Sequence, residues 1–496
     1  MTLTPQDDAR ILDPLSALLA AYTHAFPATI GIDDAPAATR VIIDSLAVAL
    51  GGLTSPAAVA ARRYARNVHS AGNCSIWGTT SSTTPEIAAL VNGVPLRAYD
   101  FNDLYVGKAD SGHPSDMVPA LIAVAEHKPT PGPELLAALS LGYTVTIALL
   151  DSCRVSPQWD YPNLVALGAT CAIAKLLGLS ETETAEALGI TVVSHAASGE
   201  IESGDLNRSG NLTMWKRFNG SDAMRQSIYA CLLAQAGVEG PVRPFVGKYG
   251  FLRILGHEAD VLERLSSELA RTHSWIGDST FKRWPVGSRA QSAVQATLEA
   301  RAGVTDIEQV REIRVVTNPE TFHHLVAVRA DPWAPISRET ADHSLPYIVG
   351  AAVLDGKIDV QSFDPAIVTD QERRAFIQSR VRVESASGLA TNDATYPSSV
   401  QIEMVDGRIC EGIGKPPLGH RLHPFDNQAI AQKFVDGTAA FLGERRARAV
   451  VRELWSISDR SDSRDALAAI DFAIVDGDDA HSHERLMELD RRFRSR

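Results

Sequence analysis

Up to about residue 280, one segment after another carries apolar residues at the spacing of an α-helix. The segments are rich in Ala and Leu, have few β-branched runs, and are separated by glycine and polar residues. Helices are predicted at 36–52, 85–99, 117–127, 134–152, 164–178, 181–195 and 221–237. Because each such helix must bury its apolar stripe against a neighbour, this part is expected to form an all-helical bundle domain.

The pattern changes after about residue 280, where apolar and polar residues alternate with the period of a β-strand. Strands are predicted at 313–317, 379–385, 400–405 and 408–413, with helices between them at 287–301 and 340–355. Asp406-Gly407 joins the last two strands, and Asp-Gly between two such runs is a strong hairpin signal. This region is therefore expected to form an α+β module.

Helical spacing returns beyond Pro416, and helices are predicted at 426–442, 444–455 and 464–474. The fold class expected is mainly α with an inserted α+β domain. We expect residues 1–278 to begin the helical domain, residues 279–415 to form a smaller α+β lid domain, and residues 416–496 to rejoin the helical domain. A cleft between two such domains is a common place for a small-molecule site.

Charge and cysteine content limit the classes of partner. The formal net charge of -13 weighs against a nucleic-acid partner, and an anionic substrate would need local basic residues to hold it. The apolar stretches near 135–150 and 164–178 are interrupted by polar residues, so they predict buried helices and no membrane partner. Single cysteines without a CxxC pair, and a start that lacks a signal-peptide pattern, favour a cytoplasmic location.

Residues 100–116 combine acidic and imidazole side chains with a glycine-containing loop that precedes a helix. Asp116 is expected to be the N-cap of that helix and Pro119 to lie in its first turn, so His113 would lie just before a helix N-terminus. The partial positive charge there disfavours imidazolium, and a neutral imidazole beside a carboxylate can transfer protons near pH 7. The alternative is that Asp100 and Asp103 merely cap a helix end and that His113 fills a turn.

A second candidate segment, residues 281–294, holds three basic side chains within eight positions. These are Lys282, Arg283 and Arg289, with a helix predicted to begin near Ser288. An arginine can bind a carboxylate through two hydrogen bonds but cannot act as a base at neutral pH. Arg283 is interpreted as a solvated surface residue, whereas Lys282 and Arg289 are candidates for carboxylate binding.

These segments, taken in order, resemble the MmgE/PrpD family. The matching residues are Asp100-Phe101-Asn102-Asp103, His113-Pro114-Ser115-Asp116, Arg208 with Gly210, Met214-Trp215-Lys216, Phe281-Lys282-Arg283, Ala341–Tyr347 and Leu354-Asp355-Gly356. The resemblance implies a helical domain with an inserted lid domain, a homodimer, and no metal or organic cofactor. Family members include 2-methylcitrate dehydratase, cis-aconitate decarboxylase and iminodisuccinate epimerase.

The resemblance and the chemistry together define a candidate site for a small polycarboxylate substrate. Asp100, His113 and Lys282 are expected to be catalytic. Residues expected to bind the substrate are Lys108, Tyr161, Arg208, Lys216 and Arg289. For Lys108 the alternative is a solvated loop side chain, and Arg208 and Lys216 flank a glycine-containing turn that could close on the substrate.

Three positions depart from the family pattern. Leu104 replaces the threonine that commonly follows the Asp-Phe-Asn-Asp run, and Tyr161 stands where many members have histidine. Arg289 stands about where dehydratase members carry histidine before Ala-Gln. These changes alter the polar lining of the expected site without removing its three catalytic candidates.

The expected function is that of a cofactor-independent hydro-lyase that dehydrates a hydroxy polycarboxylate such as 2-methylcitrate. The alternatives are decarboxylation or epimerisation of a related polycarboxylate, or a non-catalytic dimer that binds carboxylates. His323-His324 is not expected to bind a metal, because no third ligand follows at a recognisable spacing. His343 is expected to support packing between a loop and the following helix.

Overall fold

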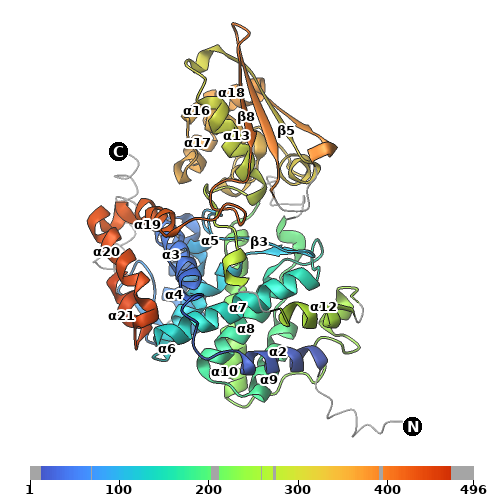
Figure 1. Cartoon of the computed structure of the whole chain (residues 1–496), viewed down its shortest axis with the longest axis vertical. Helices are drawn as coiled ribbons and strands as arrows, with labels where there is room; N and C mark the ends of the chain where they lie inside the picture. The colour runs from blue at the N-terminus through green and yellow to red at the C-terminus, as the bar shows by residue number, and fades with distance from the viewer. Residues whose placement is uncertain are drawn as a thin grey trace.

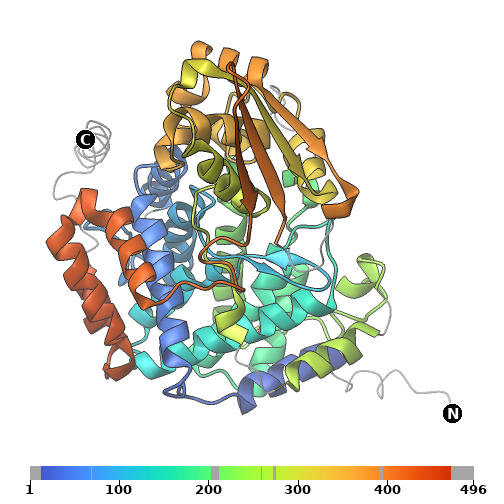
Figure 2. The same cartoon turned by 45° about the horizontal axis from the view of Figure 1, so that its top comes forward.

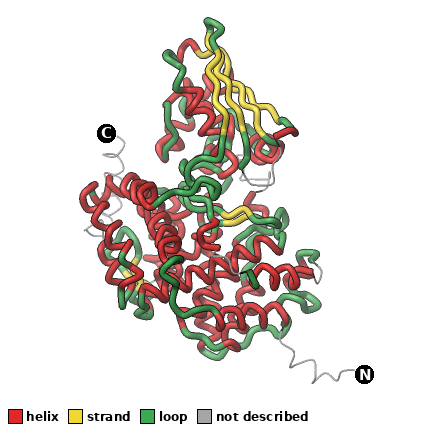
Figure 3. The backbone as a smooth tube through the Cα atoms, in the orientation of Figure 1, coloured by secondary structure: helices red, strands yellow, loops and turns green. Residues whose placement is uncertain are grey.

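The computed structural model of the chain describes residues 13–68, 70–202, 212–257, 260–271, 275–389 and 395–470. A large helical domain lies below a smaller domain that contains the main β-sheet (Figure 1). Apart from two short hairpins, the described strands belong to this smaller domain (Figure 3). The mainly α fold class with an inserted α+β domain, predicted from the sequence, is thus confirmed.

The helical domain draws on both ends of the described chain. Its helices are α2 (Pro14–Ala25), α3 (Ala35–Gly51), α4 (Pro56–Val68), α5 (Pro85–Arg97), α6 (Val118–His127), α7 (Gly132–Ser152), α8 (Pro162–Leu177), α9 (Glu181–Ser194), α10 (Asn219–Gln235), α11 (Phe251–Ile254), α12 (Asp260–Leu269), α19 (Asn427–Leu442), α20 (Glu444–Trp455) and α21 (Ser463–Leu467). Its short antiparallel hairpins are β1 (Cys74–Ser75) with β2 (Ser82–Thr83), and β3 (Tyr105–Val106) with β4 (Ser111–Gly112).

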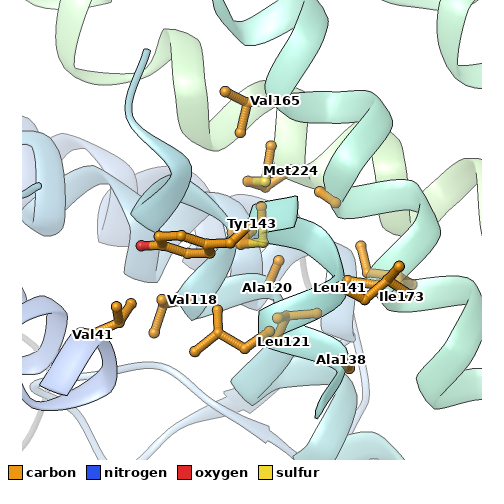
Figure 4. Packing of buried hydrophobic residues seen from close by; sticks show 14 of the residues in the cluster. Val41, Val118, Ala120, Leu121, Ala138, Leu141, Tyr143, Val165, Ile173 and Met224 are labelled. Carbon is orange, nitrogen blue, oxygen red and sulfur yellow. The ribbon is translucent and has the colours of Figure 1, made fainter. Parts of the chain in front are cut away.

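Helix α7 runs through the core of the helical domain. It is long and apolar enough to cross a membrane, but its most apolar stretch is completely buried inside the protein. Figure 4 shows Tyr143 of α7 packed among Val118 and Leu121 of α6, Val41 of α3 and Met224 of α10. Burial of each large aliphatic side chain stabilises the fold by roughly 1.5–3 kcal/mol, so this packing favours the apolar helix in the core of the protein. The interpretation of 135–150 as a buried helix is confirmed.

The smaller domain is a four-stranded sheet with helices packed against it (Figure 2). The strand order is β6-β5-β7-β8, with β5 parallel to β6 and antiparallel to β7. Its elements are α13 (Gln291–Arg301), β5 (Val310–Thr317), α14 (Pro319–Phe322), α15 (Arg338–Ala341), α16 (Leu345–Asp355), α17 (Pro365–Val368), α18 (Gln371–Arg380), β6 (Val381–Ser385), β7 (Ser398–Met404) and β8 (Ile409–Gly414). The hairpin predicted at Asp406-Gly407 joins β7 to β8, and Gly407 has a φ of 85°.

The helix predicted at 340–355 is interrupted, and the interruption helps to build the site. Ser344 is the N-cap of α16, where its side chain accepts a hydrogen bond from the backbone N–H of Tyr347, and Pro346 lies in the first turn. Residues 342–344 therefore leave the helical path between α15 and α16. Asp342 and His343 are carried in this break, at the side of the smaller domain that meets the helical domain.

Candidate active site

The backbone at Asp100 brings the first catalytic candidate into a buried position. Asp100 has a φ of 48°, in the left-handed region that non-glycine residues rarely adopt and that costs roughly 1–3 kcal/mol. Lys282 stabilises this conformation, because its Nζ donates both to the carbonyl oxygen of Asp100 at 2.8 Å and to Oδ2 of its carboxylate at 2.5 Å. Two of the three predicted catalytic residues therefore form a buried ion pair.

Basic side chains surround the carboxylate of Asp100. Besides Lys282, Arg97 Nη2 lies 3.4 Å from Oδ1 and His343 Nε2 lies 3.7 Å from Oδ2. Burial alone would raise the pKa of Asp100, but Lys282, His343 and Arg97 hold that pKa well below its usual range. Asp100 is consequently ionised near pH 7, and it can orient a cation or accept a proton.

His113 returns to the same cluster through the β3–β4 hairpin. Its Nδ1 donates a hydrogen bond to the carbonyl oxygen of Asp103, so the lone pair of the neutral ring lies on Nε2. Burial lowers the pKa of His113 well below its usual value, and the charges of Arg97 and Lys282 lower it further. The sequence predicted a neutral imidazole at His113 because of a nearby helix N-terminus. In the structure, burial is the main reason why the imidazole is neutral.

The predicted cap role of Asp116 is wrong. Helix α6 begins at Val118 without a side-chain cap, and Oδ2 of Asp116 instead accepts a hydrogen bond of 2.8 Å from the hydroxyl of Tyr161. Oδ1 of Asp116 lies 3.7 Å from Nε of Arg97. The ring of Tyr161 also meets His113 edge-on, with centroids 5.2 Å apart, so Tyr161 does line the cluster.

Asp103 has a structural role in the loop. Its carboxylate accepts a hydrogen bond of 3.1 Å from the backbone N–H of Ser115 and one of 2.8 Å from the hydroxyl of Tyr143. These bonds tie the Asp100–Asp103 segment to helix α7 and to the turn after His113. The carboxylate of Asp103 is therefore used to shape the loop that carries the catalytic candidates.

Lys216 is the predicted substrate-binding residue that lies deepest in the cluster. It belongs to the 3₁₀ helix η3 (Met214–Arg217) and is 8% exposed. Burial lowers the pKa of Lys216 to about 7, although the charges of Asp100 and Asp160 oppose this change. With this pKa the amine of Lys216 is only partly protonated at pH 7. A bound carboxylate would raise the pKa of Lys216 and restore its full positive charge.

Two other predicted binding residues lie elsewhere. The side chain of Lys108 is 58% exposed, and its ammonium binds Glu268 of α12 at 2.5 Å, because the β3–β4 hairpin directs it outward. Arg289 binds Glu320 at 2.8 Å and covers the ring of Tyr396. The structure thus places the ammonium of Lys108 at the exposed surface beside Glu268 and pairs Arg289 with a carboxylate of its own domain. Arg208 lies outside the described residues.

The sequence interpretation gave His343 a packing role, whereas the structure places it in the cluster. Its Nδ1 donates to Oδ1 of Asp342 at 2.5 Å, and Arg217 Nη2 donates to Oδ2 of Asp342 at 2.7 Å. Burial lowers the pKa of His343 to about 4, so the ring is neutral near pH 7. The Asp-His pair at a break between two helices was a usable signal in the sequence.

Arg97 was not singled out from the sequence. It ends helix α5 with its side chain 4% exposed, and its Nη1 donates to Oδ1 of Asn102 at 2.6 Å while its other nitrogens face Asp100 and Asp116. A charged residue that ends the apolar last turn of a helix was the available signal. Among residues 13–470, as far as the structure describes them, no group of three or more His, Cys, Asp or Glu is arranged to hold a metal ion.

The fold and the cluster define a class of protein: a mainly helical chain with a buried, highly charged site where an α+β domain meets the helical domain. A family model described as the MmgE/PrpD N-terminal domain matches residues 18–263, and one described as the MmgE/PrpD C-terminal domain matches residues 284–457. The chain belongs to the MmgE/PrpD family.

The curated relatives of this chain include decarboxylases and dehydratases. Cis-aconitate decarboxylase of Homo sapiens is 26% identical over 445 residues, which cover 85% of this chain and 87% of that protein. The cis-aconitate decarboxylase-like protein oryM of Aspergillus oryzae is 24% identical over 480 residues, or 90% of this chain and 95% of that protein. The 2-methylcitrate dehydratase of Cupriavidus necator is 23% identical over 369 residues, or 69% and 73% of the two chains. These similarities support an enzyme of the family.

Proposed function

We propose that this protein is a lyase that removes water from a small hydroxy polycarboxylate of the 2-methylcitrate type. The observation that carries the proposal is the neutral imidazole of His113 in the same buried cluster as the Lys282–Asp100 ion pair. Dehydration next to a carboxylate needs a base for the proton on carbon, cations for the charge that builds on the carboxylate, and an acid for the leaving hydroxyl. The cluster offers a group for each task.

His113 is assigned as the base. Because its Nδ1 proton is held by the carbonyl of Asp103, the lone pair of Nε2 takes the proton from the substrate carbon. Lys282 is assigned as the acid for the leaving hydroxyl, since burial lowers the pKa of its ammonium. Among the described residues, its Nζ donates to two acceptors, both on Asp100, so its third proton is available to a substrate oxygen. Asp100 orients Lys282, and Lys216 binds a substrate carboxylate.

Decarboxylation of an unsaturated tricarboxylate is the second candidate. It is favoured by one observation, that the human cis-aconitate decarboxylase matches more of this chain than the Cupriavidus necator dehydratase does. The same groups could serve, because loss of carbon dioxide also builds charge beside a carboxylate and ends in a proton transfer to carbon. The two candidates differ in their products, so a single assay separates them.

An NMR time course with a panel of acids tests the proposal. The purified protein is incubated separately with 2-methylcitrate, citrate, cis-aconitate and iminodisuccinate. Loss of water from a hydroxy acid supports the dehydratase, release of carbon dioxide from cis-aconitate supports the second candidate, and epimerised iminodisuccinate supports neither. A folded protein that binds one of these acids, as measured by thermal stabilisation, without turnover would point to a non-catalytic carboxylate-binding dimer.

Three further properties belong to the proposal. The family resemblance implies a reaction without metal or organic cofactor and a homodimeric assembly, and the cysteine pattern favours the cytoplasm. Turnover that persists after treatment with EDTA and gel filtration would support the first property. A dimer mass by light scattering would support the second, and microscopy of a tagged chain in the source cells would test the third.

The affinity for the acid is expected to weaken above pH 7. Lys216, with a pKa of about 7, is charged below that pH and loses its proton as the pH rises through it. KM should therefore rise by up to about tenfold per pH unit above pH 7. The control is Lys216→Arg, whose guanidinium stays charged and should give a KM that changes little from pH 6 to 9. A parallel pH dependence in the two proteins would contradict the role of Lys216.

A further inference from the structure

Lys433 of helix α19 contacts the backbone segments that carry Asp100 and Lys282. Its Nζ donates to the carbonyl oxygen of Phe101 at 3.1 Å and to that of Lys282 at 3.0 Å. It also forms an ion pair of 2.7 Å with Asp44 of α3, and it lies 4.0 Å from the centroid of the Phe101 ring. Both charged side chains are buried, with 8% of Lys433 and 1% of Asp44 exposed.

Three groups hold this ammonium. Two of its N–H groups donate to the carbonyl oxygens, and the Asp44 carboxylate forms an ion pair with it at 2.7 Å. One accepting carbonyl belongs to the residue that follows Asp100 in the sequence, and the other belongs to Lys282 itself. A single side chain therefore connects the backbone of Lys282 with the backbone of Phe101, the residue next to Asp100.

The two connected segments have only limited support from regular structure. They are joined by a backbone bridge between Leu104 and Thr280, with reciprocal hydrogen bonds of 2.9 and 2.8 Å. Asp100 lies four residues before that bridge, in the left-handed conformation. A residue in a strained backbone conformation keeps it only where the surrounding contacts hold it in place. Lys433 supplies such a contact, because it binds the carbonyl of Phe101, directly after Asp100.

Helix α19 comes from a distant part of the chain. It follows the α+β domain in the sequence and packs against α3 of the helical domain (Figure 2). The ammonium group thus joins the C-terminal helices to the first half of the chain and to the segment that leads into the α+β domain.

We propose that Lys433, with Asp44 as its counter-ion, is a positioning residue that fixes the backbones of Asp100 and Lys282 relative to each other. This proposal rests on the function proposed above for its catalytic consequence. Loss of the three contacts would let the two backbones move apart, so the ammonium of Lys282 would be misplaced for proton transfer. Substrate binding through Lys216 would be retained, which predicts a loss in kcat with little change in KM.

The test uses the double variant Asp44→Leu/Lys433→Met, which removes both charges together and leaves no unpaired buried charge. Three measurements are compared with the parent: urea unfolding, kcat and KM for the converted acid, and hydrogen exchange of peptides that cover residues 97–104 and 279–284. The matched control is Lys175→Met. Lys175 carries an ammonium that donates to the carbonyls of Thr23 and Phe26, at the contact of α8 with α2.

The double variant is expected to unfold near the urea concentration of the parent, to lose at least tenfold in kcat with KM within threefold, and to exchange faster in both peptides. The control should keep kcat within twofold and leave both peptides unchanged. A kcat of the double variant within twofold of the parent would overturn the proposal, and so would unchanged exchange in the two peptides. If the parent converts no acid, the proposed function fails, and the exchange of the two peptides alone decides whether Lys433 fixes them.

Discussion

Replacement of His113 by asparagine is expected to lower kcat by roughly 10²–10⁴-fold, the usual contribution of a positioned base. The side-chain amide of asparagine can take the place of Nδ1 and donate to the carbonyl of Asp103, so the loop keeps its hydrogen bond. Nε2, which is assigned to receive the substrate proton, is absent from that variant. The loss should therefore appear in kcat, whereas the folding of the loop is preserved.

The measurement is a steady-state assay on the acid that the parent converts, together with urea unfolding of both proteins. His113→Ala provides the comparison, because it removes both ring nitrogens and should lose activity and some loop stability together. Full activity in the folded His113→Asn variant would exclude the assignment of Nε2 as the base. An equal loss of stability in the two variants would indicate that His113 acts mainly through the loop.

The largest effect on stability is expected from Lys282→Met. This change leaves the carboxylate of Asp100 buried without its nearest cation, which costs roughly 3–5 kcal/mol of unfolding free energy at pH 7. Asp100→Asn should cost less, because burial already lowers the pKa of Lys282 and the ammonium can lose its proton once the carboxylate is gone. Both variants should have little activity. Urea denaturation at pH 7 provides the measurement.

The pH dependence distinguishes this explanation from a packing effect. In the parent, the pKa of Asp100 is held below its unfolded value, so its contribution to stability is present above that value and is lost as the pH falls. In Lys282→Met, burial is no longer opposed by that ammonium and the pKa of Asp100 should rise. The difference in unfolding free energy between variant and parent should then become smaller as the pH is lowered from 7 to 5. A difference that stays constant over this range would indicate lost packing alone.

The local pattern of the sequence predicted most of the helices and strands. Helix α20 begins and ends at the predicted residues, and α3 and α7 differ by one or two residues from their predictions. Helix α12 was not predicted, although its buried residues Val261 and Leu265 lie at helical spacing. The strand predicted at 379–385 lost its first two residues to α18, because a short alternation does not distinguish a strand from the end of a helix.

The sequence by itself determined which residues could carry the chemistry, because acidic, imidazole and ammonium groups are the ones that transfer protons and bind carboxylates. Asp100, His113, Lys282 and Lys216 were found from this chemistry together with the resemblance to the MmgE/PrpD family, and they lie in one cluster. Lys108 was expected to bind the substrate or to be a solvated loop side chain, and the structure shows its ammonium exposed beside Glu268.

Only the tertiary structure decided which of these groups meet and in which protonation state. His343 lies 243 positions after Asp100 in the chain, yet its ring lies 3.7 Å from that carboxylate, because the break before α16 points toward the helical domain. Lys433 acquires its role through burial beside Asp44, which is distant in the sequence, and Arg97 is buried between Asp100 and Asp116. The spacing of residues along the chain does not show which side chains become buried beside distant segments. Burial and neighbouring charges set the pKa values on which the chemistry depends.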